Sequence, residues 1–505
     1  MGENRIGSVY FLGIGGIGMS ALARYFMQQG ARVSGYDKTP SALTHQLIGE
    51  GMNIHFTEDP SLIPEDVDLA VWTPAIPKEH PEYRHLLERG IQVKKRAEVL
   101  GEIASRFTTI AVAGTHGKTT TSTMIAHLFH TAGKSMLAFL GGISNNYETN
   151  FVRSEVRSQE SEVRNQDSLS SLHPFIPSSP HHHITIPPYH HTTTCIVEAD
   201  EFDRSFLQLS PDIAIITSMD ADHLDIYNHK DHLKHSFGDF AERIRQHGSL
   251  IIKKGIDLDR KLPEPVSRFT YALEGAADFT ASSISIQDGL IHFDLVTPDK
   301  TIPGFVLGMP GMFNLENAIA ALAAAWISGI PESVLKQAMQ DFSGVVRRFD
   351  IRIKRDDFIY IDDYAHHPEE LHACIHAVKE LFPGKKVTGI FQPHLYSRTR
   401  DLADDFARVL AELDALILLD IYPAREKPIE GVDSTMLLDK TDLADKVLCD
   451  KGELLQILDK RHPEILLTLG AGDIDQLVKP ITDHFAKETD SLKTIADHKE
   501  NGPEQ

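Results

Sequence analysis

The stretch Ala111-Val112-Ala113-Gly114-Thr115-His116-Gly117-Lys118-Thr119-Thr120-Thr121 joins an apolar segment to a glycine turn and then to a helical pattern. We predict a strand from about residue 109 to 113 and a helix that opens at Thr119 and ends near Gly133. Backbone N–H groups of such a turn converge on one point, and the helix N-terminus adds partial positive charge. Lys118 can reach a terminal phosphate, and the hydroxyl of Thr119 or Thr120 can bind magnesium. The pattern indicates the triphosphate site of an ATP-using enzyme.

The spacing of this turn differs from the usual P-loop pattern, G-x-x-x-x-G-K-[ST], because the first glycine of that pattern would fall at Val112. The alternative is an ordinary strand-to-helix turn with a solvated lysine. The order of strand, Gly-Lys-Thr and helix favours the phosphate site.

Length and composition bound the remaining interpretation. The chain has 505 residues, which is enough for roughly three domains of ordinary size. Its formal net charge is −22, which excludes nucleic-acid binding through a general basic surface. The three cysteines, Cys195, Cys374 and Cys449, lie far apart and in no metal-binding spacing. No apolar run reaches transmembrane length, and no signal peptide is evident, so we expect a cytoplasmic chain without membrane insertion.

A second glycine turn follows the first apolar segment of the chain. Gly13, Gly15 and Gly18 satisfy G-x-G-x-x-G after residues 9–12, and a strand over residues 32–36 ends at Asp37. This pattern predicts a dinucleotide or diphosphate cradle in a Rossmann-like domain over residues 1–106. The alternative is that the glycines serve only tight helix–strand packing.

The central region, residues 107–346, changes character part-way along. From about residue 145 to 194 it is rich in Ser, Pro, His, Gln and charged residues, and it has few periodic apolar positions. Such a segment cannot bury enough surface to offset its ordering entropy, so we predict a disordered insertion in a surface loop. Its position between the P-loop helix and Glu198 predicts that its ends lie close to the active site. Histidine-rich tracts such as His181-His182-His183 sometimes bind metal, but a tolerated loop is the simpler interpretation.

Acidic residues follow two further predicted strands of this domain. Glu198-Ala199-Asp200-Glu201 comes directly after residues 194–197, and Asp220-Ala221-Asp222-His223-Leu224-Asp225 follows residues 213–217. Carboxylates at strand ends beside a P-loop suit magnesium, whereas His223 suits a metal or the γ-phosphate. Solvated turns are the alternative. Asn314 and Asn317 lie one turn apart at the start of a helix expected over about residues 314–328, where amides suit adenine, phosphate or simple capping.

The third region, residues 347–486, alternates strands with helices, and each loop after a strand is polar. Asp363 and His366 follow one strand, His394, Arg398 and Arg400 follow the next, and Asp420 and Asp473 follow two more. This order predicts a doubly wound parallel sheet with ligands at the strand carboxyl ends. Residues 487–505 form a polar tail that we expect to be disordered.

Taken together and in this order, these motifs resemble the Mur ligase family. The resemblance rests on the glycine cradle, Gly-Thr-His-Gly-Lys-Thr, Glu-Ala-Asp-Glu, Asp-Ala-Asp-His-Leu-Asp, Arg-Arg-Phe-Asp, Asp-Asp-Tyr-Ala-His-His-Pro and Ser-Arg-Thr-Arg. It implies three α/β domains: a Rossmann-like domain for a UDP-sugar, a P-loop ATPase-type domain for ATP and Mg²⁺, and a Rossmann-like domain that closes over the amino acid. The implied reaction joins L-alanine to the lactyl carboxylate of UDP-N-acetylmuramate through an acyl phosphate, in peptidoglycan biosynthesis.

The resemblance also assigns residues to roles. Lys118 would contact the β- and γ-phosphates, Arg348 would enter the site from the third domain, and His366 is the candidate base for the amine. The remaining assignments are Gly114, Thr115, His116, Gly117, Thr119, Thr120, Asn314, Asn317 and Asp363 for ATP; Gly13, Gly15, Gly16, Gly18, Met19, Ser20 and Asp37 for the UDP-sugar; Thr119, Glu198 and His223 for magnesium; and His394, Arg398 and Arg400 for the amino acid.

Three positions depart from the family pattern, and three alternatives stay open. Phe313 stands where related ligases commonly have histidine, Leu395 replaces a common arginine, and Pro74 interrupts a usual serine pair. The alternatives are a recycling ligase that joins a tripeptide to the same UDP-sugar, a nicotinamide-dependent oxidoreductase built on Gly13 to Asp37, and a non-catalytic nucleotide-binding regulator. We expect a monomer or weak homodimer.

Overall fold

The structure is a computed structural model that describes residues 6–155, 193–219, 230–287, 289–424 and 426–486. It divides into two compact units. The first comprises Met1–Gln287, His292–Gly308 and Leu315–Ser343, and the second comprises Asp288–Ile291, Met309–Asn314 and Gly344–Gln505. The first unit therefore contains both the cradle and the P-loop.

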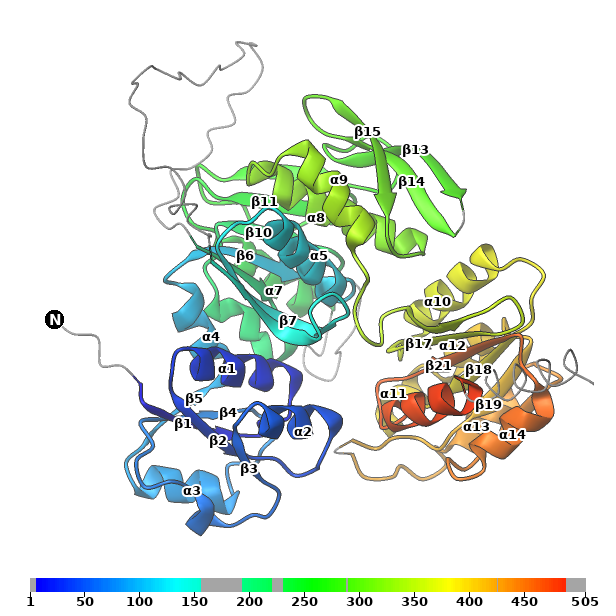
Figure 1. Ribbon diagram of the computed structural model, residues 1–505, viewed down its shortest axis with the longest axis horizontal. Coiled ribbons are helices and arrows are strands. Elements are labelled where there is room, and N and C mark those ends of the chain that lie inside the picture. The colour runs from blue at the N-terminus through cyan, green and yellow to red at the C-terminus, as the bar shows by residue number, and fades with distance from the viewer. Residues whose placement is uncertain (1–5, 156–192, 220–229, 288, 425, 487–505) are drawn as a thin grey trace, which may run out of the picture. The chain divides into compact units, whose positions relative to one another are not determined.

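The first sheet of the first unit is parallel, with the order β3-β2-β1-β4-β5. Its strand residues alternate between two apolar clusters, so both faces are buried, as a parallel sheet requires. Figure 1 shows α1 and α3 on opposite sides of this sheet. The elements are β1 (Ser8–Leu12), α1 (Ile17–Gln28), β2 (Arg32–Tyr36), α2 (Ala42–Gly49), β3 (Asn53–His55), η1 (Pro60–Leu62), β4 (Leu69–Trp72), α3 (Pro81–Glu88), β5 (Gln92–Lys95) and α4 (Arg96–Ala104).

The second sheet places the P-loop strand β6 (Thr108–Ala113) between β9 (Thr194–Glu198) and β10 (Ile213–Ile216), in the order β12-β11-β10-β6-β9-β7-β8. All three strands are parallel, so the loops after them emerge at one edge of the sheet. The other elements are α5 (Lys118–Thr131), β7 (Met136–Ser144), β8 (Thr149–Ser154), η2 (Phe202–Gln208), α7 (Lys230–Ala241), β11 (Ser249–Lys253) and β12 (Ser267–Tyr271).

A small three-stranded sheet and two helices complete the first unit, except that the first residues of β14 (290–291) and of α8 (312–314) are grouped with the second unit. The sheet has the order β13-β14-β15, and α9 packs on both β15 and α5. The long helix α8 begins at Met312, two residues earlier than the sequence predicts. The bounds are β13 (Thr280–Gln287), β14 (Leu290–Val296), β15 (Thr301–Leu307), α8 (Met312–Ile327) and α9 (Glu332–Asp341).

The prediction that the insertion begins at about residue 145 is wrong for its first eleven residues. Residues 149–154 form β8, which pairs antiparallel with β7 and buries Phe151 and Val152. The segment was misassigned because only two large apolar side chains stand among polar neighbours. Residues 156–192 lie outside the described part of the chain.

The expectation that the ends of the insertion lie near the active site is also wrong. Ser154 and Thr194 both pair with Met136, on its two sides, and Met136 is the first residue of β7. Thr194 begins β9, whereas Glu198 ends it. Both residues that flank the insertion therefore lie at the amino-terminal ends of β7 and β9, whereas the P-loop follows the carboxyl end of β6.

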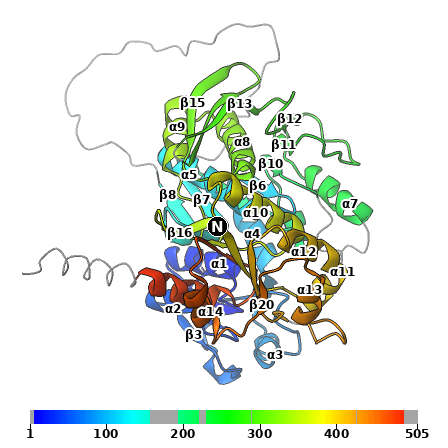
Figure 2. The same cartoon turned by 90° about the vertical axis from the view of Figure 1, so that its right-hand side faces the viewer.

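The second unit is built on a six-stranded sheet with the order β16-β17-β21-β18-β19-β20, parallel except for β16. One apolar cluster covers each face, and α12 packs against α10 and α13 on one of them (Figure 2). The elements are β16 (Asp350–Lys354), β17 (Ile359–Asp363), α10 (Pro368–Leu381), β18 (Val387–Phe391), α11 (Tyr396–Asp401), α12 (Ala403–Leu410), β19 (Ala415–Leu418), α13 (Ser434–Lys440), β20 (Lys446–Leu448), α14 (Leu454–Arg461) and β21 (Ile465–Leu469). The predicted doubly wound sheet is confirmed.

Candidate active site

The turn between β6 and α5 has a backbone that only glycine accommodates at two positions. Gly114 has φ +139° and Gly117, the N-cap of α5, has φ +82°. A Cβ added at Gly117 would overlap Oδ1 of Asn317, and one at Gly114 would overlap the hydroxyl of Thr217. The turn therefore has the glycine geometry that its sequence predicts, and Asn317 lies against it, while the contact of both with ATP stays a prediction.

Two hydroxyl residues after β10 hold the loop from the side, and the sequence analysis missed both. The Ser218 hydroxyl accepts the N–H of His116 at 2.7 Å and lies 2.8 Å from the Thr115 hydroxyl. The Thr217 hydroxyl donates to the carbonyl of Ala113 at 3.1 Å. The available signal was a pair of hydroxyl residues immediately after a strand that neighbours the P-loop strand.

Lys118 is held over its own loop by a buried carboxylate. Its ammonium donates to the carbonyl of Gly114 at 2.5 Å and lies 3.0 and 2.8 Å from the two oxygens of Glu201, whose side chain is 0% exposed. Burial favours a lower pKa for Lys118, but the carboxylates of Glu201, Glu198 and Asp200 outweigh it, so that the pKa lies above its ordinary value. Lys118 is thus a permanently charged group at the phosphate loop.

The described residues offer the oxygen ligands that magnesium prefers. Glu198 ends β9 level with Val112 of β6, and an added Cβ at Gly141 would overlap its carboxylate. The Thr119 hydroxyl belongs to the first turn of α5 and is nearly buried. His223, the third predicted ligand, lies outside the described residues, and within those residues no cluster of three His, Cys, Asp or Glu side chains forms a metal site. Thr119 and Glu198 fit magnesium in chemistry, and their role stays a prediction.

The remaining residues predicted for ATP lie in α5 and in the first two turns of α8. Thr120 is buried in α5, and the Thr121 hydroxyl donates to Asn317 at 3.4 Å. Asn314 belongs to the second unit, where its amide donates to the carbonyl of Pro310 at 2.6 Å. Asn317 therefore has geometric support as a neighbour of the P-loop, and Asn314 has a structural partner.

The cradle turn packs tightly against the ends of β2 and β4. The N–H groups of Gly13 and Ile14 donate to the carbonyl of Tyr36, and the N–H of Gly15 donates to Asp37 at 2.7 Å. Added Cβ atoms would lie 2.8 Å from Thr73 at Gly13 and 2.8 Å from Asp37 at Gly15. Asp37 thus lies beside the turn and fixes the glycine backbone, and its predicted contact with the UDP-sugar stays a prediction.

Helix α1 starts directly after this turn. Its N-cap is Gly16, and no side chain of the described residues caps it, so the N–H groups of its first turn suit an anion. A Cβ added at Gly18 would lie 2.9 Å from the guanidinium of Arg96, which pairs with Asp200 at 3.3 Å. Met19 and Ser20 are buried in α1, so their side chains serve packing rather than an open surface.

Asp363 of the second unit sits in a buried pocket of backbone donors. It accepts the N–H of Phe349 at 2.6 Å and the N–H of Ala365 at 2.7 Å. Burial raises its pKa to about 6, against the opposing effects of Arg348 and these two N–H groups. The carboxylate orders the loop after β17, and its predicted contact with the nucleotide stays a prediction.

An aromatic row follows the strand carboxyl ends of the second unit. The Arg348 guanidinium lies 4.8 Å from the ring centroid of Tyr364, whose ring is 5.2 Å from His366. His366 is 6.0 Å from His394, and His394 stacks on Tyr422 at 5.7 Å. The structure therefore brings His366 next to His394 and links Arg348 to His366 through Tyr364, while the roles of the three residues stay predictions. Nδ1 of His366 lies 3.0 Å from the carbonyl of Tyr364 and 3.2 Å from Glu370, and its predicted role as a base stays a prediction.

The two arginines predicted for the amino acid both lie on α11, but their surroundings differ. Arg400 is about half exposed and pairs with Asp401 at 2.7 Å, which is the geometry of a surface ion pair. Arg398 is only partly exposed. Leu395, the N-cap of α11, has φ +71°, a strained value for a residue with a side chain.

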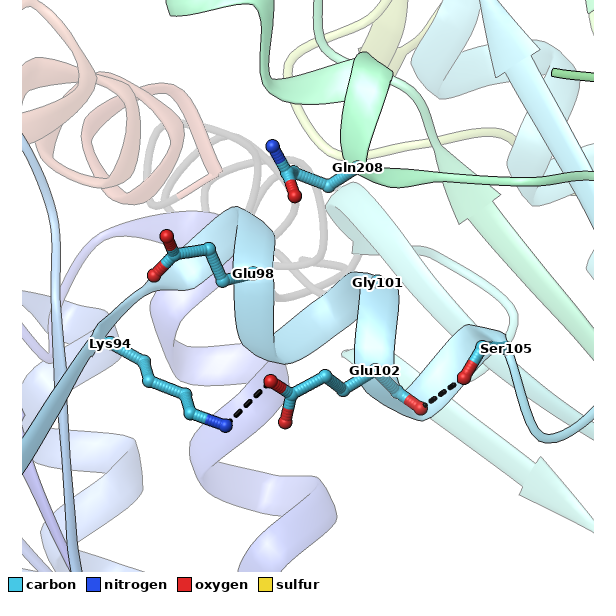
Figure 3. Close-up of a pocket in the computed structure, with 6 residues that line it drawn as sticks. All are labelled: Lys94, Glu98, Gly101, Glu102, Ser105 and Gln208. Atoms are coloured by element: carbon cyan, nitrogen blue, oxygen red, sulfur yellow. Dashed lines mark hydrogen bonds and ion pairs between the residues drawn. The ribbon is translucent and has the colours of Figure 1, made fainter.

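The structure has two further cavities, one away from this set of residues and one that borders it at Tyr422. One of about 510 Å³ is lined by α4 and Gln208, and Figure 3 shows Lys94 reaching Glu102 across it, an ion pair of 2.5 Å. The other, of about 410 Å³, lies at the strand carboxyl ends of the second unit, where Gln392, Tyr422 and Lys451 line it. The second cavity is also lined by Asp420 and Asp473, two of the polar residues that follow strands of this sheet.

Comparison with known proteins places these sites in a family. Sequence models described as Mur ligase family catalytic domain, Mur ligase middle domain, and Mur ligase glutamate ligase domain match residues 8–108, 112–325 and 347–472. This chain belongs to the Mur ligase family. The three matched segments correspond to the cradle, the P-loop region and the six-stranded sheet.

Individual Mur ligases match over nearly their whole length. UDP-N-acetylmuramate–L-alanine ligases of Parabacteroides distasonis and Flavobacterium psychrophilum are 47% and 45% identical, over 97% and 95% of this chain and 99% and 98% of theirs. The solved UDP-N-acetylmuramate–alanine ligase of Thermotoga maritima has a TM-score of 0.76 at 24% identity, covering 96% of this chain and 99% of its own. That structure shows the shared three-domain α/β fold. No helix within the described ranges combines the length and apolar character needed to cross a membrane.

Proposed function

We propose that this chain is an ATP-dependent ligase that joins L-alanine to the lactyl carboxylate of UDP-N-acetylmuramate, in cytoplasmic peptidoglycan synthesis. The observation that carries the proposal is the P-loop lysine, Lys118, held by buried Glu201 in the same compact unit as an uncapped glycine cradle. The full-length similarity to L-alanine ligases supports the choice of substrates.

The phosphate loop suits phosphoryl transfer because positioning and charge neutralisation dominate that reaction. In the proposed reaction the lactyl carboxylate attacks the γ-phosphorus of ATP, and ADP leaves, so that an acyl phosphate forms. Lys118 stabilises charge on the transferring phosphoryl group, while the glycine N–H groups orient the triphosphate. Magnesium, held by Thr119, Glu198 and His223, would neutralise further phosphate charge when bound.

The second step is attack of the neutral amine of L-alanine on the acyl carbon, with release of phosphate. A base must accept a proton from the amine, and Nε2 of His366 suits this task because Nδ1 faces two acceptors, the carbonyl of Tyr364 at 3.0 Å and Glu370 at 3.2 Å, which orient the ring. Arg398 is the candidate clamp for the alanine carboxylate. The 410 Å³ cavity and the row from Tyr364 to Tyr422 offer polar and aromatic walls beside His394.

Phosphate release with UDP-N-acetylmuramate, ATP and Mg²⁺ tests the proposal directly. The assay compares L-alanine, glycine, L-serine and a tripeptide as the amine. We expect L-alanine to give the highest kcat/KM. A response to the tripeptide alone would overturn the proposal in favour of a recycling ligase, and hydride transfer to a nicotinamide cofactor without phosphate release would indicate an oxidoreductase.

A further inference from the structure

One side chain of the seven-stranded sheet that carries the P-loop reaches the first turn of α1, the helix that follows the glycine cradle. Asn150 lies in β8 and is fully buried. Its amide donates to the carbonyl of Ile17 at 2.6 Å and to the hydroxyl of Ser20 at 2.9 Å. Ile17 is the first residue of α1, directly after the glycine turn.

The amide of Asn150 is fully satisfied, which fixes its orientation. Both N–H donors are used on α1, and its oxygen accepts from the guanidinium of Arg24, also in α1. Arg24 is in turn held by Glu50 at 2.7 Å. A buried network in which every member is paired holds one geometry, and leaving one donor or acceptor unpaired costs a desolvation penalty.

Ser20 has its hydroxyl committed inside this network. It donates to the carbonyl of Ile17 at 2.9 Å and accepts from Asn150. A hydroxyl engaged in this way positions the helix and does not present a donor to a ligand. We therefore reassign Ser20 from a diphosphate contact to the support of the turn.

Aromatic packing supports the same junction. Tyr25 of α1 lies 5.6 Å from Phe139 of β7 and 6.0 Å from Phe151 of β8. The hairpin β7–β8 thus contacts α1 through apolar side chains and through the hydrogen bonds of Asn150. These hydrogen bonds reach the N-terminal turn of α1, where the N–H groups suited to an anion are located.

We propose that Asn150 is a positioning residue for the UDP-sugar: from the P-loop sheet, it fixes the first turn of α1 so that its N–H groups meet the diphosphate. This role rests on the proposed function. Through this contact the seven-stranded sheet that carries the P-loop also supports the UDP-sugar site, although in this proposal Asn150 itself touches no substrate. It predicts a selective effect on the UDP-sugar, with ATP binding unaffected.

The test compares Asn150→Ala and Asn150→Asp with Asn146→Ala. Asn150→Asp preserves volume but sets a carboxylate against the Ile17 carbonyl. Asn146 is the matched control, because it lies in the loop of the same hairpin and its amide hydrogen-bonds to residues at and just after the end of α9, donating to Asp341 at 2.8 Å and Ser343 at 3.3 Å and accepting from Ser343 at 2.9 Å, and none of these bonds reaches α1. Kinetics of phosphate release and calorimetric binding of UDP-N-acetylmuramate without ATP are measured, with circular dichroism as the check of folding.

We expect Asn150→Ala to raise the KM and Kd for UDP-N-acetylmuramate about tenfold, because the buried hydrogen bonds of the Asn150 amide to α1 are lost. Asn150→Asp should raise them more. The KM for ATP and kcat should stay within about twofold, and Asn146→Ala should behave like the wild type. Unchanged UDP-sugar affinity in both Asn150 variants, or an equal rise in the KM for ATP, would overturn the role. Wild-type enzyme that binds the UDP-sugar but releases no phosphate with L-alanine would instead overturn the proposed function.

Discussion

The first unit contains two strand–turn–helix segments with similar glycine turns and opposite electrostatics. The cradle between β1 and α1 has no lysine, and its nearest acid, Asp37, is bound by the backbone of Gly15. The loop between β6 and α5 carries Lys118, which faces Glu201 and is influenced by Glu198. The cradle turn therefore offers a ligand backbone N–H groups alone, whereas the P-loop turn also offers the charged group of Lys118, which is held by acidic residues.

This difference matches the two tasks in the proposed reaction. A diphosphate that stays intact needs only to be held, and backbone donors at a helix N-terminus do this. A phosphoryl group in transfer develops charge that must be neutralised within the site. In the proposed reaction one local fold would serve binding alone in the first turn and binding with chemistry in the second, so substitutions in each should give separable effects.

The largest effect is expected from Lys118→Met. Removing the ammonium should lower kcat for phosphate release by about 10³-fold, because a transition-state charge partner is lost. It also leaves Glu201 buried without its cation, so the free energy of unfolding should fall. The double variant Lys118→Met/Glu201→Gln should recover the stability but not the activity. Near-normal turnover in Lys118→Met would remove the basis for the phosphate site.

The next largest effect is a change in the free energy of unfolding with pH, caused by His127 in the P-loop helix α5. Burial, with help from His130, lowers the pKa of His127 from 6.5 to about 4. The unfolded chain gains this proton near pH 6.5 and the folded chain only near pH 4, so stability falls as pH drops through this window. The loss should reach roughly 3 kcal/mol. His127→Gln should remove that part of the dependence in denaturant titrations, whereas exposed His130→Gln should retain it.

Gly117→Ala should lower kcat/KM for ATP by about 10²-fold. The added Cβ meets both a positive φ and the amide of Asn317, so the loop must move. Gly133→Ala is the matched control, because its φ is +63° but nothing lies within 4 Å of the added Cβ. The control should lose a little stability and no activity. Equal kinetic losses in both variants would mean that strain alone, without contact to the loop, explains the effect.

A substitution in the cradle turn should have a smaller effect, and it should affect the UDP-sugar rather than ATP. Gly15→Ala forces a Cβ against Asp37 and Thr44, so the KM for UDP-N-acetylmuramate should rise about tenfold while the KM for ATP stays constant. The measurement is the same phosphate-release assay with each substrate varied in turn. A rise in the KM for ATP instead would show that the two turns do not act separately.

The smallest effect is expected when residues 156–192 are replaced by a six-residue Gly-Ser linker. Ser154 and Thr194 flank Met136 on neighbouring strands, so their backbones are roughly 10 Å apart, within reach of such a linker. The linker would join the chain at the amino-terminal ends of β7 and β9, whereas the P-loop follows the carboxyl end of β6. We expect kcat and both KM values to stay within about twofold, and a tenfold loss would show that this segment takes part in catalysis.

Local sequence was sufficient for the features that stand next to a strand end. Both glycine turns, Asp37, Glu198 and the loop at Asp363 follow apolar runs directly, so strand, turn and helix signals agree at each of them. The third domain was predictable for the same reason. The helix start at Met312 was missed by two residues, which is the ordinary scatter of a boundary without a strong cap.

Contacts across long sequence separations were not predictable. Ser218 reaches His116 across 102 residues, Asn150 reaches Ile17 across 133, and Glu201 reaches Lys118 across 83. Residue type and periodicity carry no information on such pairs, which depend on strand order. The strand β8 was missed because its apolar content is low, and the position of the insertion ends required the register of β7 with both of its neighbours.

The central place of β6 has a consequence for how the chain acquires its shape. Its two partners, β9 and β10, begin 86 and 105 residues after β6 begins. A growing chain that ends before residue 194 therefore carries the strand with both edges open, and pairing at such separations is slow. Synthesis must pass residue 216 before the nucleotide loop gains both flanking strands, so productive folding of the first unit awaits more than half of its length.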